Sequence, residues 1–128
     1  MQIEDLTHTY SAGTPFQRSA VEGLSMTVGA GEFLGVIGHT GSGKSTLIQH
    51  LNGLLQPTSG EIYMDGKNIT HASPDKRGMG IVFQNYALYP HLTVRQNILF
   101  PMQNLKGKER LSKEEMTRRA DNAAKLVQ

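Results

Sequence analysis

The chain has 128 residues, of which 38% are hydrophobic and 19% are charged, and its net charge is only +2. The absence of cysteine excludes disulfides, thiolate zinc sites and a cysteine nucleophile, and no apolar run approaches the ~20 residues that span a bilayer. The densest basic stretch, residues 106–119, is interrupted by glutamates and predicts a solvated surface, so no nucleic-acid partner is expected. The first residues lack the layout of a secretory signal, which favours a cytoplasmic location.

Two segments near the N-terminus are predicted to pair as antiparallel strands. Residues 2–10 alternate loosely between apolar and polar side chains, and residues 21–28 carry apolar side chains at mostly two-residue spacing. The loop between them contains Gly13 and Pro15, which are typical of turns. Residues 1–31 are therefore predicted to form an N-terminal antiparallel β subdomain.

The central part of the chain combines apolar strand patterns with one helix pattern. Residues 33–37 are nearly all apolar, which is typical of a strand covered on both faces of a parallel sheet. Residues 61–65 and 79–83 predict two further strands, and residues 44–51 predict a helix. Residues 32–92 form the predicted core unit. The buried face of its helix is expected to hold Leu47, Ile48 and Leu51.

The last segment, residues 93–128, predicts the start of a helical subdomain. Thr93 can cap a short helix that Pro101 would stop. Ser112 and Glu115 match a capping box, in which each side chain satisfies the other's backbone N–H. The apolar face of the helix that follows is predicted to hold Met116, Ala120, Ala123 and Val127.

The strongest functional signal is a G-x-x-x-x-G-K-[ST] motif between the apolar segment 33–37 and the helix pattern. Backbone N–H groups of such a loop can surround phosphates, glycines permit the close approach, and the helix adds its N-terminal dipole. Lys44 can reach the β- and γ-phosphates, the Ser45 hydroxyl can ligate Mg²⁺, and Thr46 can donate to the α-phosphate. A glycine-rich turn with a chance lysine is the structural alternative. The motif comprises Gly38, His39, Thr40, Gly41, Ser42, Gly43, Lys44 and Ser45.

Two stretches extend this motif to a family. Residues 36–60 read VIGHTGSGKSTLIQHLNGLLQPTSG, followed by EIYMDGKNI, and residues 80–98 read GIVFQNYALYPHLTVRQNI. The first resembles the ATP-binding subunits of ABC transporters, especially those of energy-coupling-factor vitamin importers, and the second resembles the Q-loop region of sugar-importer ATPases. The resemblance implies an α/β P-loop NTPase fold with ATP and Mg²⁺ as cofactors. Because the two stretches match different branches, a mosaic or engineered origin is a further hypothesis.

The resemblance also implies roles for residues outside the motif. Tyr10 matches the aromatic residue that stacks on adenine, although it could instead pack on a strand neighbour. Gln84 matches the Q-loop glutamine, which contacts Mg²⁺ or the attacking water, although it could simply close a strand. Residues 85–94 would line the groove for a membrane permease, whereas their apolar side chains equally suit a local core. These apolar side chains are Tyr86, Leu88, Tyr89 and Leu92.

The resemblance further predicts what the chain lacks. The LSGGQ signature, the Walker B strand ending in Asp-Glu, the D-loop and the switch histidine do not occur in the 128 residues, so the chain is expected to be truncated before them. Mg-ATP binding with weak or no hydrolysis is therefore predicted. Partners would be a permease at the inner face of the membrane, a second ATPase subunit and, through an exposed sheet edge, a second copy of this chain.

Other functions are compatible with the same glycine-rich loop. A minimal P-loop ATPase, a non-catalytic nucleotide-binding module and a small-molecule P-loop kinase all use the same loop. In the kinase alternative, Arg77, Arg95 or Arg110 would close over the phosphates. The five histidines have no metal-ligand spacing and are expected at surface or loop positions, and the sequon at Asn68 is taken as incidental.

Overall fold

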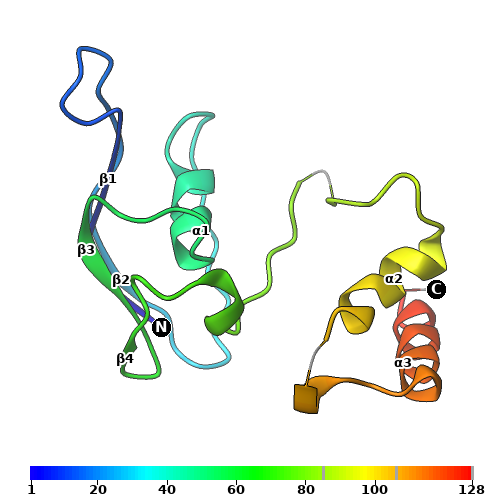
Figure 1. The fold of residues 1–128 in the computed structure, drawn as a ribbon. Helices are drawn as coiled ribbons and strands as arrows, with labels where there is room; N and C mark the ends of the chain where they lie inside the picture. Colours follow the sequence, from blue (N-terminus) through cyan, green and yellow to red (C-terminus); the bar gives the residue numbers. More distant parts are fainter. Residues whose placement is uncertain (85, 106, 128) are drawn as a thin grey trace. The chain divides into compact units, whose positions relative to one another are not determined.

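The computed structural model describes residues 1–84, 86–105 and 107–127, and the chain divides into two compact units, Met1–Ile81 and Val82–Gln128. The first unit contains four strands, one helix and a short 3-10 turn, and the second contains two helices and a 3-10 turn (Figure 1). The three-part division given above is finer than these two units and remains a prediction. The elements of the first unit are β1 (Gln2–Tyr10), β2 (Arg18–Thr27), α1 (Lys44–Leu51), β3 (Ser59–Met64), β4 (Lys67–Asn68) and η1 (Pro74–Lys76).

The sheet of the first unit has the order β2-β1-β3-β4, with every neighbouring pair antiparallel. Ile3 near the start of β1 pairs with Met26 on β2 and with Ile62 on β3. The predicted antiparallel pairing of the two N-terminal segments is therefore confirmed. Gly60 has φ +90°, and a Cβ there would collide with the carbonyl of Asp5, so this strand contact requires glycine.

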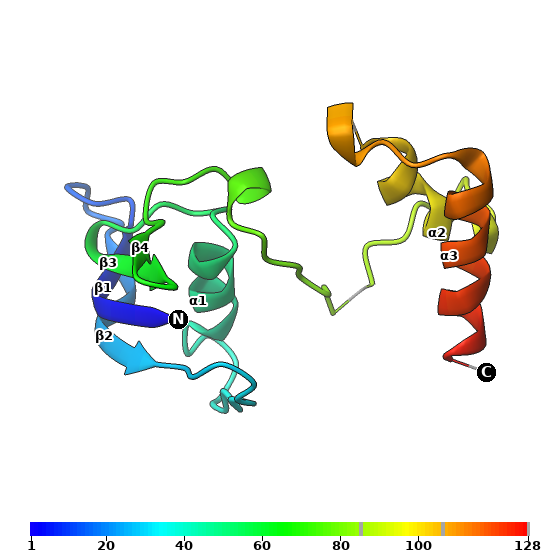
Figure 2. The ribbon, with the colours of Figure 1, turned by 90° about the horizontal axis from the view of Figure 1, so that it is seen from below.

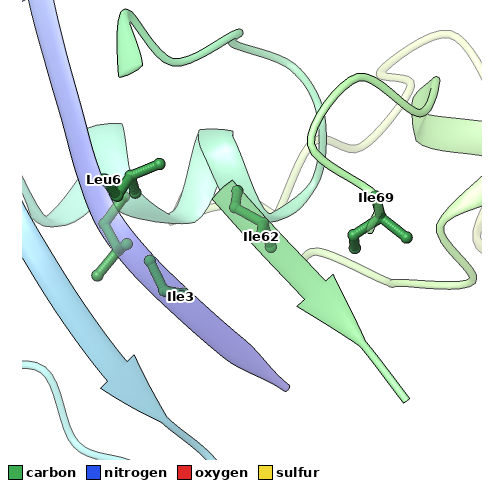
Figure 3. Packing of buried hydrophobic residues seen from close by; sticks show 5 residues of the cluster. Ile3, Leu6, Ile62 and Ile69 are labelled. Carbon is green, nitrogen blue, oxygen red and sulfur yellow. The ribbon is translucent and has the colours of Figure 1, made fainter. Parts of the chain in front are cut away.

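The core of the first unit lies on the side of the sheet that α1 covers (Figure 2). Ile3, Leu6 and Ile62 from the strands are buried together with Leu47 from α1 and Ile69 after β4, and Figure 3 shows the strand side chains clustered there. Each fully buried side chain of this size contributes about 1.5–3 kcal/mol by leaving water.

The helix α1 begins and ends at the predicted residues, but its buried face differs from the prediction. Leu47 is buried and Leu51 is half-buried, whereas Ile48 is 42% exposed. Thr46 and His50 take the buried places because they lie one residue before and three residues after Leu47 on the same side of the helix.

Two predicted strands do not form. Residues 33–37 and 79–83, all within the described part of the chain, are extended loops, and Phe33, Ile37 and Val82 are almost fully exposed. An isolated apolar segment gains neither ladder hydrogen bonds nor buried area unless strands flank it. The described sheet has β2 and β4 at its edges and pairs with neither segment, so the strand predictions were wrong for this chain.

The second unit contains α2 (Val94–Gln103), η2 (Gly107–Glu109) and α3 (Lys113–Lys125). The helix α2 passes through Pro101 and ends two residues later, so the predicted stop was wrong. Pro101 has no N–H to donate to the carbonyl of Asn97, and the helix nevertheless continues for two residues beyond it. The side-chain amide of Asn104 donates to the carbonyl of Phe100 at 2.9 Å and satisfies one of the last carbonyl groups.

The capping box is found at a different helix from the predicted one. Thr93 and Gln96 form the full reciprocal box at the start of α2. At α3 the hydroxyl of Ser112 accepts from the N–H of Glu115, but the Glu115 carboxylate pairs with arginines instead of returning to the cap. These ion pairs lower the pKa of Glu115.

The apolar face predicted for α3 is only partly buried. Ala120 is buried, whereas Ala123 and Val127 are exposed. The buried side of the helix includes the half-buried Ala124 instead, because Ala120 and Ala124 are one turn apart. An ion pair of 3.2 Å between Arg95 and Asp121 also joins α2 to α3. Among the described residues, no helix is both long and apolar enough to cross a membrane.

Candidate nucleotide-binding site

The glycine-rich loop is folded around the ammonium group of Lys44. Lys44 Nζ donates to the carbonyl of Gly38 at 2.7 Å, to the carbonyl of His39 at 2.8 Å and to the hydroxyl of Ser42 at 3.2 Å. The loop is closed by a backbone hydrogen bond of 3.2 Å from the N–H of Ser42 to the carbonyl of His39. A single cation is therefore held at the centre of a turn of backbone.

Glycines are needed in this turn for two separate reasons. Gly41 and Gly43 have φ values of +82° and +86°, which side chains disfavour. A Cβ on Gly38 would lie 2.6 Å from Ser42 Oγ and 4.0 Å from Lys44 Nζ, so it would fill the space that the loop encloses. A Cβ on Gly43 would collide with the carbonyl of Ala20 on β2. The loop is thus a cradle that only glycine leaves open.

The N-terminus of α1 opens into this cradle. Among the described residues, no side chain caps the helix and no acidic residue lies in its first turn. The N–H groups of the first turn and the helix dipole are consequently available to an anion. The hydroxyl of Ser45 is exposed and makes no hydrogen bond within the described residues, so it is free to act as an oxygen ligand for Mg²⁺.

A hollow of about 330 Å³ lies beside the loop. Residues 42–44 of the loop and Leu47 of α1 line it on one side, and residues of β2 together with Val36 and Ile37 line the rest. The carboxylate-bearing Glu22 also lines it. The cation of Lys44 is therefore placed at the edge of a concave surface.

The structure brings Tyr10 and Thr46 together. The Tyr10 hydroxyl lies 3.3 Å from the hydroxyl of Thr46, and Tyr10 as a residue is 41% exposed. The ring also packs edge-on against His8, with centroids 4.5 Å apart. Contact with a strand neighbour is thus present, and stacking of the exposed part of Tyr10 on adenine remains a prediction.

Two histidines behind Tyr10 were not identified from the sequence as site residues. His50 is completely buried on α1, so the expectation that the histidines lie at surface or loop positions was wrong for it. Its ring packs against that of His8 on β1 at a centroid distance of 4.5 Å. Burial lowers the pKa of His50, and the charges of His8 and Arg77 act in the same direction. The spacing of His8 and Tyr10 on one strand was the available signal.

Arg77 lies at the opposite end of α1 from the phosphate cradle. Its buried guanidinium donates to the carbonyls of His50 at 2.7 Å and Leu51 at 3.0 Å, which are the last carbonyls of α1. It also donates to the carbonyls of Thr70 at 2.7 Å and Ala72 at 2.9 Å. Arg77 therefore caps the helix and does not reach the phosphate cradle, which corrects the kinase alternative for this residue. Burial lowers its pKa.

Gln84 belongs to the second unit, where it is exposed in a turn. Its role toward Mg²⁺ or water stays a prediction. Of the two other arginines in the kinase alternative, Arg95 is paired with Asp121 and Arg110 lines a hollow of about 590 Å³ between α2 and α3.

The segment predicted to receive a permease forms a small apolar surface in the second unit. Asn85 at its start lies outside the described residues, as does Lys106 in the basic stretch. Tyr89 packs against Phe100 of α2 with a centroid distance of 4.5 Å, and the side-chain amide of Asn97 donates to the carbonyl of Tyr89 at 3.2 Å. Tyr86 and Leu88 are exposed beside a hollow of about 550 Å³. Both a local core and an exposed surface are therefore present.

Comparison with known proteins identifies the family. The family model described as ABC transporter matches residues 21–128. The chain belongs to the ABC transporter family. Over 99% of its length it is 44% identical to the energy-coupling factor transporter ATP-binding protein EcfA2 of Clostridium acetobutylicum, of which it covers 45%. It is also 40% identical over its whole length to the sn-glycerol-3-phosphate import ATP-binding protein UgpC of Bartonella quintana, covering 34% of that protein.

A solved structure places this family chain in the P-loop NTPase fold. The dimeric ATP-binding cassette MJ0796 bound to ADP and Pi superimposes with a TM-score of 0.80 at 32% identity, over 97% of this chain and 55% of that one. The predicted fold class is thereby confirmed, and this chain spans about half the length of the relatives it matches. Relatives from both importer branches match nearly the whole chain, and the mosaic origin remains a hypothesis.

Proposed function

We propose that this ABC transporter chain binds Mg-ATP through the loop of residues 38–45. The observation that carries the proposal is the enclosure of Lys44 Nζ by the carbonyls of Gly38 and His39 in front of an uncapped helix. A cation among neutral carbonyls can exchange those contacts for stronger charge-assisted bonds to phosphate oxygens. When the Lys44 ammonium group leaves the carbonyls for the phosphates, the N–H groups of the loop would also become exposed to the phosphates.

The remaining roles follow from the residues beside the cradle. Ser45 would hold Mg²⁺, which neutralises charge on the β- and γ-phosphates when it is bound. Thr46 would donate to the α-phosphate, and Tyr10, held to Thr46 by their hydroxyl contact, would stack on adenine. Gln84 would sense the γ-phosphate.

Hydrolysis by these 128 residues alone is proposed to be weak or absent. No apolar run in the sequence ends in an Asp-Glu pair that could orient the attacking water, and no LSGGQ donor segment is present. A missing general base typically costs 10²–10⁴-fold in rate. Lys44 and Ser45 would still stabilise the phosphates, so binding survives without efficient turnover.

The proposed partners are a membrane permease and a second ATPase subunit, with the chain in the cytoplasm at the inner face of the membrane. The exposed apolar surface at Tyr86 and Leu88 supports permease contact. Self-association is also proposed, since Phe33 and Ile37 expose apolar side chains on backbone that no described strand pairs.

The test is the affinity for Mg-ATP of the wild type, of Lys44→Ala and of the matched control Lys67→Ala, measured by calorimetry alongside phosphate release. Lys67 is an exposed lysine on β4. We expect Lys44→Ala to weaken binding about a hundredfold, since bonds to charged groups contribute about 1.5–3 kcal/mol. Equal affinities for the three proteins would refute the proposed site. Phosphate release by the wild type at the rate of a complete transporter ATPase would refute the proposed weak turnover.

A further inference from the structure

Two histidine rings connect the strand that carries Tyr10 to the helix that carries Thr46. His8 and Tyr10 stand on the same face of β1, and the His8 ring contacts both Tyr10 and His50 at centroid distances of 4.5 Å. His50 in turn is one helical turn after Thr46, and its Nδ1 lies 2.7 Å from the Thr46 carbonyl. Together with the hydroxyl contact between Tyr10 and Thr46, these contacts form a closed ring of four residues.

The hydrogen bonds of the two rings fix where their protons lie. His8 Nδ1 is 3.1 Å from the carbonyl of Gln56, and His50 Nδ1 faces the carbonyl of Thr46. Because a carbonyl oxygen only accepts, each Nδ1 carries the proton and each neutral ring leaves Nε2 unprotonated. Both Nε2 atoms are buried and have no hydrogen-bond partner among the described residues.

A second proton on His50 would meet an unfavourable environment. Burial, the charge of the neighbouring His8 and the Arg77 cation oppose it more strongly than the backbone carbonyls of Thr46 and Gln56 favour it, so the pKa of His50 is lowered. The groups that face the pair are Tyr10 from β1, the Gln56 carbonyl and the guanidinium of Arg77, which donates to the His50 carbonyl at 2.7 Å. Of these only Arg77 is charged, and it is a cation.

We propose that His8 and His50 are positioning residues that hold Tyr10 against Thr46, where it can stack on adenine, only while both rings are neutral, so that acid weakens ATP binding. This inference rests on the proposed function of Tyr10 and Thr46. Protonation would separate the two rings, and the strand end with Tyr10 would move away from α1. The loop around Lys44 is formed by its own backbone and does not depend on the pair.

The test compares the affinities for Mg-ATP and for Mg-tripolyphosphate at about pH 5.5 and about pH 8, on either side of the ordinary histidine pKa. Tripolyphosphate lacks adenine and ribose, and so reports on the loop without Tyr10. The proteins are the wild type, His8→Gln, His50→Gln and, as a matched control, His71→Gln, which changes an exposed histidine of the same unit. Ionisation of the phosphates themselves affects all four proteins alike.

We expect the wild type and His71→Gln to lose about tenfold more ATP affinity on acidification than His8→Gln and His50→Gln, which corresponds to about 1.4 kcal/mol. The extra loss should be absent with tripolyphosphate. The same pH profile in all four proteins would overturn the inference alone, whereas failure of the wild type to bind Mg-ATP at either pH would overturn the proposed function together with it.

A measurement on the wild type keeps the inference testable if a glutamine variant does not fold. Nitrogen-detected NMR of the histidine rings reports tautomer and protonation directly. Nδ1–H tautomers at both rings, with a His50 ring that stays neutral below about pH 6.5, would support the pair, since ordinary histidines titrate near that value. Nε2–H tautomers or ordinary titration of His50 would overturn it.

Discussion

Two apolar regions of the first unit behave in opposite ways. Ile62 on β3 is completely buried, whereas Ile37, just before the phosphate cradle, is 95% exposed. Both lie in segments of high strand propensity, but β3 pairs with β1 on one side and β4 on the other. The two regions therefore differ in burial because β3 has neighbouring strands and the segment of Ile37 has none among the described residues, and not because their compositions differ.

The cradle forms next to a segment without strand structure because its own contacts are local. Lys44 holds the loop through contacts within eight residues of sequence, and α1 is anchored by Leu47 in the core and by Arg77 at its C-terminal end. The preceding segment contributes only part of the hollow's wall. The phosphate site thus depends on the paired region and on local geometry, and little on residues 33–37.

The largest expected effect is on the free energy of unfolding, and it should differ strongly between substitutions of Ile62 and Ile37. Ile62→Ala should lower the free energy of unfolding by about 2–5 kcal/mol, because it leaves a cavity between the sheet and α1. Ile37→Ala should change it by less than about 0.5 kcal/mol, as expected for an exposed side chain. Chemical denaturation of both variants checks this. Comparable losses would mean that residues 33–37 are packed in solution.

A second prediction concerns what the unpaired segment does at higher concentration. At tens of micromolar, where exposed strand edges promote association, the wild type should sediment as more than a monomer. Ile37→Lys should shift the chain toward monomer, while the same change on the polar face at Thr117 should not. A monomeric wild type under these conditions would count against self-association through this segment.

The smallest expected effect is the pH dependence of stability that His50 causes in the region of paired strands. Since the pKa of His50 is lowered in the folded chain, the unfolded chain binds more protons below the ordinary value of about 6.5. Stability should therefore be full above that pH and fall as the pH drops toward the folded-state pKa, by about 1.4 kcal/mol for each unit of lowering. Denaturation midpoints of the wild type and His50→Gln across this range provide the measurement. A parallel decline in both would exclude His50 as the cause.

Local patterns in the sequence were sufficient for elements that depend on local contacts. The bounds of α1 and the pairing of β1 with β2 were predicted correctly, because glycine turns and apolar spacing determine them. Residues 33–37 were predicted wrongly because a central strand exists only when distant segments flank it. The apolar pattern of α1 does not indicate a buried histidine, although the position of His50 relative to Leu47 places it on the buried side.

The most direct test of the central claim is hydrogen exchange along the wild-type chain with and without Mg-ATP. Without nucleotide, amides of β1 and β3 should exchange slowly and those of residues 33–37 rapidly. Mg-ATP should then protect residues 38–47, where the loop and the first turn of α1 lie. Unchanged exchange in residues 38–47 at saturating Mg-ATP would contradict the account.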